Sequence, residues 1–229
     1  MWRGCAAARL ISPETWLKAS LSSRTKQRIR NHNSIPLDFE DHFQDNSLVF
    51  DDPKEKEPNK TQLIDALHSD VYVVFGASYI KGWLIDFLVE HRAINIHMGL
   101  SPYYRGSSCN FWALYDNNPS YVGSTIHLLS KGLDSGDMLF HCVPQLHSED
   151  SPFDFTMRSV LVAQQGIVSA VENKSIFSAQ SVKQDKSQEV RYTKNQDFTD
   201  DVAKEFLERN LQLNADSFSY PVLLNPIFG

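Results

Sequence analysis

The chain has 229 residues and a formal net charge of −6, and 41% of its residues are hydrophobic while 22% are charged. A chain of this length and composition can bury a full core, which excludes a mainly disordered protein, and no apolar run approaches the ~18–20 residues that a membrane span needs. Three cysteines without a Cys-x-x-Cys spacing fit a reducing compartment and argue against a disulfide framework or a structural zinc site.

The first 33 residues are basic and contain a single acid, Glu14. Ser12, Pro13 and Glu14 have the order typical of a helix start, so we expect a helix that runs toward Arg30. This basic arm has three interpretations: a solvated surface helix, a mitochondrial presequence, and a patch that touches a phosphate-bearing substrate. Because the charge is confined to an arm while the rest of the chain is acidic, we expect no nucleic-acid partner.

Residues 31–59 lack periodicity and contain three prolines among acidic residues, which predicts a loop or an insertion. The composition therefore divides the chain into three parts. Residues 1–60 form the basic helix and acidic loop, residues 61–180 a folded core, and residues 181–229 a tail with a short helix. We expect the protein to be cytoplasmic, with no membrane association.

Apolar spacing predicts a short helix over residues 61–67, and the continuous apolar run at residues 71–75 predicts a strand buried on both faces. Helical spacing follows over residues 81–90, and a further strand is predicted over residues 93–97. This alternation is typical of βαβ units and predicts an α/β fold with a mostly parallel, twisted sheet. In such sheets ligands bind beyond the carboxyl ends of the strands.

The second half of the core contains further elements, and Ser151 followed by Pro152 opens a long helix. We expect the inward face of this helix to include Val160, Ala163 and Ile167. The apolar residues that end the chain give no indication of their packing. The other predicted elements are a helix over 110–115, a strand over 121–129, a loop over 132–137, a strand over 138–143 and a helix over 199–208.

Asn95 and His97 lie two residues apart on a predicted strand, so their side chains point into the same space. An amide and an imidazole are suitable donors for a developing oxyanion, and a carboxylate can orient the imidazole. Asp134, in a loop flanked by glycines, is the candidate for that carboxylate. A satisfied structural histidine and a turn-forming aspartate are the alternatives.

Among the eight histidines, His127, His141 and His147 are the ones to consider as metal ligands. They lack a His-Glu-x-x-His frame or any tight ligand spacing, so we expect no metal site.

Three segments in order resemble the formyl transferase family, which includes glycinamide ribonucleotide, methionyl-tRNA and sugar N-formyltransferases. Residues 95–106 read Asn-Ile-His-Met-Gly-Leu-Ser-Pro-Tyr-Tyr-Arg-Gly, similar to the family's Asn-x-His, Leu-x-Pro and Tyr-Arg-Gly signature. Residues 123–127 resemble the family's Gly-x-Thr-x-His strand, and residues 133–138 resemble Leu-Asp-x-Gly-x-Ile. The resemblance covers about forty residues and implies a Rossmann-like formyltransferase fold.

The resemblance implies that Asn95 and protonated His97 stabilise the oxyanion of formyl transfer, while Asp134 orients His97 and relays protons. It implies 10-formyltetrahydrofolate as the formyl donor, bound between the loop after the strand that precedes Asn95 and the loop that carries Asp134. On the acceptor side it implies Tyr104, Arg105 and Gly106, although a structural ion pair is an equal alternative for Arg105. The implied donor contacts are Gly76, Ala77, Ser78, Tyr79, Ile80 and Lys81, together with Ser130, Lys131, Gly132 and Leu133.

Two departures from the family pattern bear on the substrate and the fold. Residues 98–102 read Met-Gly-Leu-Ser-Pro instead of the commoner Pro-Ser-Leu-Leu-Pro, a version that resembles sugar or uncharacterised formyltransferases. Residues 1–33 contain no hydrophobic strand, so we expect the fold to lack the usual first βα unit.

The leading hypothesis is an N-formyltransferase acting on an amino group of a small acceptor, such as a nucleotide-linked amino sugar. The stretch Arg-Tyr-Thr-Lys at 191–194 resembles the tail of short formyltransferases related to the sugar enzymes, and we expect no separate tRNA-binding domain. A hydrolase of 10-formyltetrahydrofolate and a non-catalytic folate-binding or partner-binding remnant are the alternatives. The oligomeric state is open, and a homodimer is one option.

Overall fold

The computed structural model describes residues 5–8, 66–77 and 80–229. The expected helix from Ser12 toward Arg30, the loop over residues 31–59, most of the helix over residues 61–67, and residues Ser78 and Tyr79 lie outside the described residues.

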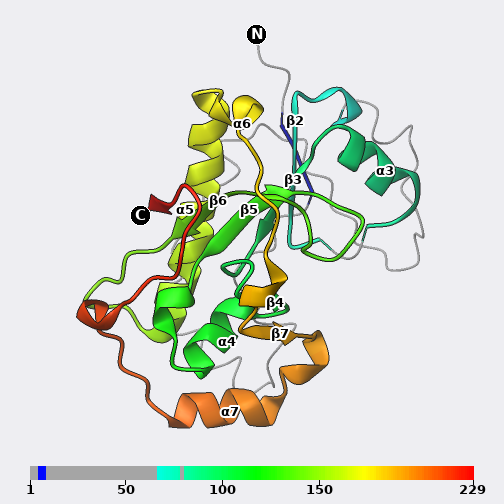
Figure 1. Ribbon diagram of the computed structural model, residues 1–229. Helices are drawn as coiled ribbons and strands as arrows, with labels where there is room; N and C mark the ends of the chain where they lie inside the picture. The colour runs from blue at the N-terminus through cyan, green and yellow to red at the C-terminus, as the bar shows by residue number, and fades with distance from the viewer. Residues whose placement is uncertain (1–4, 9–65, 78–79) are drawn as a thin grey trace.

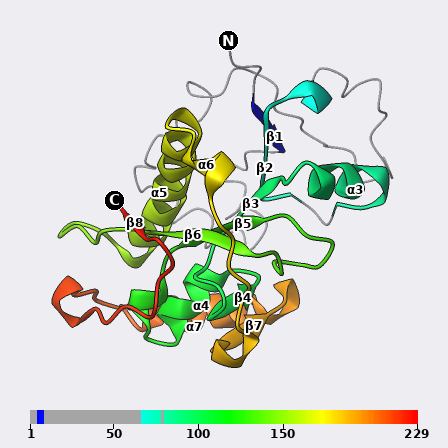
Figure 2. The ribbon, with the colours of Figure 1, turned by 45° about the horizontal axis from the view of Figure 1, so that its top comes forward.

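A sheet of six strands, in the order β1-β2-β3-β5-β6-β8, forms the centre of the molecule (Figures 1 and 2). The pairings β1/β2, β2/β3 and β6/β8 are parallel, whereas β5 runs antiparallel to both β3 and β6. The α/β class with a mostly parallel sheet is therefore confirmed. The strands are β1 Cys5–Ala8, β2 Val71–Phe75, β3 Ile94–His97, β5 Ser124–Leu128, β6 Met138–Val143 and β8 Ile227–Phe228.

The strand β1 corrects the expectation that residues 1–33 contain no strand. Its residues pair in parallel with β2, with Cys5 opposite Val71 and Ala8 opposite Val74. Its composition carries no strand signal because alanine has a low strand propensity, so this strand depends on its neighbour rather than on its own residues. The chain from residue 9 to residue 65 lies outside the described residues.

The central strands are covered on both faces, as predicted for a strand buried in a parallel sheet. On β2, Val71 and Val73 join the apolar cluster beneath helix α5 (Pro152–Glu172), while Tyr72 and Val74 pack against helix α3 (Gly82–Glu90). This alternation follows from the two-residue period of a strand. The helices α5 and α3 accordingly lie on different sides of the sheet (Figure 1).

Helix α5 begins as the sequence predicts. Ser151 caps it in a reciprocal capping box with Asp154, and Pro152 is in the first turn. The predicted inward residues Val160, Ala163 and Ile167 are all buried in the core. The predicted helices over 110–115 and 199–208 are also present, as α4 Cys109–Tyr115 and α7 Asp200–Glu208.

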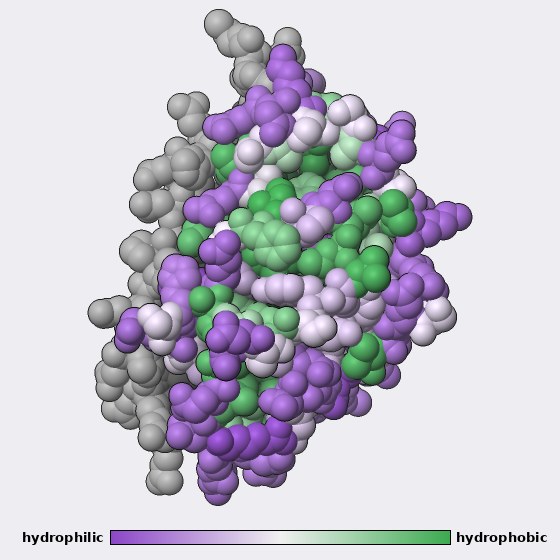
Figure 3. Space-filling model, turned by 60° about the vertical axis from the view of Figure 1, so that its left-hand side comes forward, coloured by the Kyte–Doolittle hydropathy of each residue, from purple (hydrophilic) through white to green (hydrophobic). Residues whose placement is uncertain are grey.

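Residues 181–229 form two strand pairings that the sequence did not predict. Strand β7 (Arg191–Thr193) pairs in parallel with β4 (Tyr104–Gly106), and β8 pairs with β6. The apolar residues at the end of the chain therefore extend the central sheet. Figure 3 shows the side of the molecule on which the C-terminal end lies, with apolar side chains in its middle and polar ones around them.

The remaining elements are short. They are helix α6 (Ser175–Ser178) and the 3-10 turns η1 Ala66–His68, η2 Pro119–Tyr121, η3 Lys186–Gln188, η4 Asn195–Asp197 and η5 Ala215–Ser217. Within the described part of the chain, no helix is both long and apolar enough to cross a membrane.

Candidate active site

Strand β3 and the loop between β5 and β6 bring Asn95, His97 and Asp134 together. The Asn95 amide nitrogen Nδ2 donates to Oδ1 of Asp134 at 3.4 Å, and the His97 Nδ1 lies 3.5 Å from the same oxygen. Ile94 and Ile96 point the other way, into the cluster under α5, as the strand period predicts. Two nitrogen donors thus converge on one oxygen atom, the arrangement that a tetrahedral oxyanion also needs.

Asp134 occupies a tightly constrained loop. Its φ of +44° lies in the left-handed region, which aspartate tolerates better than most residues. Two residues later, a Cβ on Gly136 would lie 1.6 Å from the Leu128 carbonyl oxygen, so only glycine fits there. The loop therefore passes directly over the end of β5 and returns the carboxylate to β3.

His127 is a fourth member of this cluster, although it is not among the site residues predicted from the sequence. It faces Asn95 across the β3/β5 ladder, and its Nε2 lies 3.0 Å from Asn95 Nδ2. Its Nδ1–H donates to the Leu128 carbonyl at 2.8 Å, so Nε2 is the acceptor and Asn95 the donor. The signal that could have found it was the family-like strand at 123–127, which ends on this histidine.

Burial and neighbouring charges shift the pKa values of all three titratable groups of the cluster. Burial opposes a charged His97, but the Asp134 carboxylate and the Cys109 sulfur outweigh it, so the pKa of His97 is raised well above 6.5. Burial works against an ionised Asp134 too, yet His97 above all, then His127 and Arg105, lower the pKa of this carboxyl. Burial lowers the pKa of His127 to about 4. At neutral pH the cluster therefore holds one cation, one anion and one neutral imidazole.

A backbone carbonyl group and a cysteine sulfur lie against the inner side of the His97 ring. Its Nε2–H donates to the Tyr104 carbonyl at 3.2 Å, and Cys109 Sγ lies 3.5 Å from the same nitrogen. A Cβ on Gly99 would lie 2.5 Å from Cys109 Cβ and 2.9 Å from His97 Nε2. The glycine that departs from the family pattern is thus required here, because Cys109 and the imidazole already fill the space.

The predicted acceptor-side residues have distinct surroundings. The Tyr104 side chain is 1% exposed, and its hydroxyl donates to Asp116 and accepts from Asn118. A Cβ on Gly106, whose φ is +88°, would lie 1.9 Å from the Thr193 carbonyl oxygen, so glycine permits the β4/β7 pairing. Acceptor contact by these two residues stays a prediction.

Arg105 forms a structural ion pair, one of its two predicted roles. Its Nη1 lies 2.8 Å from Glu189 Oε2, and the guanidinium is close enough to Asp134 to favour the ionised carboxylate. Its Nε is buried and has no hydrogen-bond partner among the described residues. The structural role is therefore real, and a role toward the acceptor stays a prediction.

The residues predicted to contact the formyl donor lie on two segments. Gly76, Ala77 and Lys81 are exposed after β2, and Ile80 packs with the cluster around α3. In the loop after β5, the Ser130 hydroxyl donates to the Gly132 carbonyl at 3.1 Å, while Leu133 is 55% exposed.

Lys131, in the same loop, forms an ion pair of 2.6 Å with Asp86 of α3. This contact joins the loop after β5 to the helix that follows the first segment. Ser78 and Tyr79 lie outside the described residues, and the donor contacts stay predictions.

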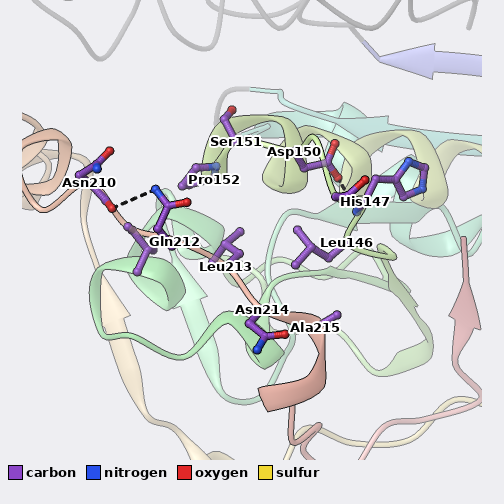
Figure 4. Close-up of a pocket in the computed structure, with 12 residues that line it drawn as sticks. Leu146, His147, Asp150, Ser151, Pro152, Asn210, Gln212, Leu213, Asn214 and Ala215 are labelled. Atoms are coloured by element: carbon purple, nitrogen blue, oxygen red, sulfur yellow. Dashed lines mark hydrogen bonds between the residues drawn. The ribbon is translucent and has the colours of Figure 1, made fainter.

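A separate hollow of about 400 Å³ lies between the segments 146–152 and 210–215 (Figure 4). None of its lining residues belongs to the cluster of Asn95, His97, His127 and Asp134. Asp150, on its wall, is held by Arg158 and by the backbone N–H of His147. Among the residues that the structure describes, no group of His, Cys, Asp and Glu is arranged to hold a metal ion.

The fold agrees with the family that the sequence motifs resemble. The sequence model of the formyl transferase family matches residues 18–171, and the chain belongs to that family. The resemblance found in the sequence is therefore confirmed, together with the Rossmann-like formyltransferase fold.

Curated relatives are methionyl-tRNA formyltransferases. That of Thermosynechococcus vestitus is 34% identical over 96 residues, which cover 42% of this chain and 29% of the relative. That of Anaeromyxobacter sp. strain K is 27% identical over 140 residues, 61% of this chain and 45% of the relative. The chain spans less than half the length of these relatives.

Similar solved structures include sugar-modifying members of the family. PseJ from Anoxybacillus kamchatkensis, in complex with UDP-4,6-dideoxy-4-formamido-L-AltNAc and tetrahydrofolate, is 20% identical with a TM-score of 0.55, and the match covers 95% of this chain and 94% of PseJ. A sugar N-formyltransferase from Shewanella sp. is 16% identical with a TM-score of 0.53, covering 94% of this chain and 82% of that one. At these identities the likeness shows the fold.

Proposed function

We propose that this protein is an N-formyltransferase that moves the formyl group of 10-formyltetrahydrofolate to an amino group. The observation that carries the proposal is the convergence of Asn95 Nδ2 and His97 Nδ1 on Asp134 Oδ1, at 3.4 and 3.5 Å. Family membership supports the same chemistry. In this proposal Asn95, His97 and Asp134 are the catalytic residues.

The reaction needs the groups that the cluster contains. The acceptor nitrogen attacks the formyl carbon, a new C–N bond forms, and the carbonyl oxygen becomes an oxyanion that the Asn95 amide and the His97 imidazolium stabilise. The bond between the formyl carbon and N10 then breaks. The proton that the acceptor nitrogen loses passes, with Asp134 and His97 as relay, to N10, so that a formamide and tetrahydrofolate leave.

The protonation states fit these roles. A raised pKa keeps His97 positively charged at neutral pH, which suits a group that must donate to an oxyanion. A lowered pKa keeps Asp134 ionised and able to accept a proton. Because His127 stays neutral and accepts from Asn95 Nδ2, it fixes which way the Asn95 amide points.

For the formyl donor we propose the segments 76–81 and 130–133, in which Gly76, Ala77, Lys81, Lys131, Gly132 and Leu133 are exposed. They follow β2 and β5, next to the cluster on β3, and PseJ was solved with tetrahydrofolate. The exposed Leu133 directly precedes Asp134, so a folate ring that packs on Leu133 would lie beside the catalytic carboxylate.

For the acceptor we propose a nucleotide-linked amino sugar. The support is the PseJ complex with a UDP-linked formamido sugar, whose fold matches this chain over 95% of its length. Methionyl-tRNA is the competing acceptor, because the curated relatives carry that name. The net charge of −6 favours the small acceptor, since RNA binding depends on basic surface.

The experiment is an incubation of the protein with 10-formyltetrahydrofolate and one acceptor at a time. The acceptors are a panel of UDP- and dTDP-linked amino sugars and methionyl-tRNA, with a reaction lacking acceptor as the blank. Mass spectrometry of the acceptor detects the added formyl group. We expect formylation of an amino sugar that depends on the protein.

Three other outcomes of this experiment would each contradict a part of the proposal. Formylation of methionyl-tRNA alone would overturn the acceptor class. Rapid release of tetrahydrofolate and formate without any acceptor would identify a hydrolase. No turnover of the folate in any reaction, with Asn95→Ala indistinguishable from the parent in folate binding, would favour the non-catalytic alternative.

A further inference from the structure

Gln184 lies on the segment between α6 and β7, outside the residues assigned to the site. Its side-chain Nε2 donates to two backbone carbonyl oxygens of the catalytic loop, that of Asp134 at 2.9 Å and that of Gly136 at 2.8 Å. We propose that Gln184 is a positioning residue that holds the Asp134 carboxylate against His97. This inference rests on the proposed function only for its kinetic consequence.

The Asp134 carboxylate depends on support from elsewhere because its own side-chain contacts are long. Asp134 Oδ1 lies 3.4 Å from Asn95 Nδ2, 3.5 Å from His97 Nδ1 and 3.9 Å from His127 Nε2. Good hydrogen bonds to oxygen are ~2.7–3.2 Å, so Asn95 and His97 orient the carboxylate weakly, and the neutral His127 has no proton on Nε2 to donate. The two bonds from Gln184 are the short ones, and they fix the backbone on which the carboxylate is mounted.

The two carbonyl oxygens that the Gln184 carboxamide faces determine its orientation. Its two N–H groups meet two carbonyl oxygens, whereas a flipped amide would place its own oxygen against them. Its Oε1 is buried and has no hydrogen-bond partner among the described residues. A buried acceptor without a partner is unfavourable. The two hydrogen bonds that Nε2 donates therefore explain why an amide side chain is present at this position.

A short strand-like contact places Gln184 at this point. Val182 and Met138 form an antiparallel bridge with two hydrogen bonds of 2.8 Å each, directly after the catalytic loop. Two residues beyond Val182, the Gln184 side chain reaches back over the loop. Bridge and carboxamide together hold both ends of the stretch 134–138.

The same segment also supports the opposite side of the site. Glu189 pairs with Arg105, and β7 pairs with β4, whose Tyr104 carbonyl accepts from His97. Residues 182–193 therefore contact both the loop that carries Asp134 and strand β4, which lie on two sides of the His97 ring. Besides Asp134, the titratable groups that face this ring within the described part of the chain are Cys109 from α4 and His127 from β5, and Gln184 forms no hydrogen bond with either.

The test uses Gln184→Met, which keeps the length of the side chain and removes both donors, and Gln184→Asn, which keeps the amide but is one methylene shorter. Gln180→Ala is the matched control, because Gln180 is exposed four residues earlier on the same segment. The first readout is the NMR titration of His97 in protein with labelled histidine rings, assigned with His97→Gln. This readout does not depend on activity.

We expect His97 to lose its proton at lower pH in both Gln184 variants than in the parent and in Gln180→Ala. In the kinetic readout we expect kcat to fall by about 10-fold to 100-fold, with KM for 10-formyltetrahydrofolate within about 2-fold, because the reacting groups are displaced while the binding segments remain. The alkaline limb of the pH–rate profile should move in the same direction as the NMR titration.

An unchanged His97 titration in both variants would overturn the inference. Loss of a cooperative thermal transition in both would assign Gln184 a general structural role and would overturn it as well. A parent without formyl transfer would refute the proposed function, while the NMR titration would still decide the role of Gln184.

Discussion

Two histidines of the central sheet are both buried, but their pKa values are shifted in opposite directions. His97 on β3 is 5% exposed and His141 on β6 is 1% exposed. The pKa of His97 is raised well above its ordinary value, whereas burial lowers the pKa of His141 to about 4. Burial acts in the same direction on both, so their neighbours make the difference.

Both ring nitrogens of His141 form hydrogen bonds with neutral backbone groups. Its Nε2–H donates to the Ser101 carbonyl at 2.9 Å, and its Nδ1 accepts from the Leu224 backbone N–H at 2.9 Å. A second proton on this ring would meet an N–H group, so the imidazole stays neutral and joins the loop after β3 to the tail. His97 instead faces the Asp134 carboxylate, which favours the charged imidazolium.

The most direct way to remove the difference between the two histidines is Asp134→Asn. We expect kcat to fall by about 10²-fold to 10⁴-fold, because the imidazolium loses its counter-charge and the proton relay is interrupted. Asp137→Asn, three residues along the same loop, is the control and should retain parent activity. Steady-state kinetics measure both, and a parent-like kcat in Asp134→Asn would contradict the proposed roles.

The pH dependence of the reaction sharpens the comparison. A raised His97 pKa means that activity persists through neutral pH and is lost as the pH rises through that value, about tenfold per unit beyond it. A lowered Asp134 pKa places the acid limb below the ordinary carboxyl range of about 3.9. An alkaline limb near the ordinary histidine value of about 6.5 would refute the charged His97.

Gly99→Ala tests the fit around the His97 ring. The added methyl group collides with Cys109 Cβ and His97 Nε2, so we expect a loss of about 1–3 kcal/mol in the free energy of unfolding and a lower kcat. In the double variant with Cys109→Gly, which removes the nearer collision, part of the stability should return. Urea denaturation of the single and double variants measures the recovery, and strictly additive losses would contradict the packing.

His141→Gln tests the neutral histidine. With a folded pKa of about 4, His141 contributes stability above its unfolded value of about 6.5 that is lost as the pH falls toward 4. Between pH 7 and pH 5 the free energy of unfolding should fall by about 2 kcal/mol through His141, and this part of the fall should be absent in His141→Gln. Urea denaturation at both pH values gives the difference, and His147→Gln, at an exposed position, is the control. If the free energy of unfolding had the same pH dependence in His141→Gln and in the parent, the lowered pKa of His141 would be refuted.

Local patterns in the sequence determined two kinds of feature. These are the helices and strands that follow from the spacing of apolar residues, and the family that follows from the order of the motifs. The apolar run at 71–75, the helical spacing at 81–90 and the start of α5 at Ser151 predicted elements that the structure contains. Strand alternation placed Asn95 and His97 on one face, and three segments in order identified the family. These features need no knowledge of distant neighbours.

Only the tertiary structure decided which distant groups meet. The strand at Cys5–Ala8, the β4/β7 pairing and the sheet edge at β8 have weak patterns of their own and form through their partners. The same holds for two side-chain contacts. His127 lies beside Asn95, 32 residues away in sequence, and Gln184 contacts the loop of Asp134, 50 residues away. A sequence names the side chains, but the proton affinity of His97 or His141 depends on the charges and carbonyls that folding brings within about 4 Å.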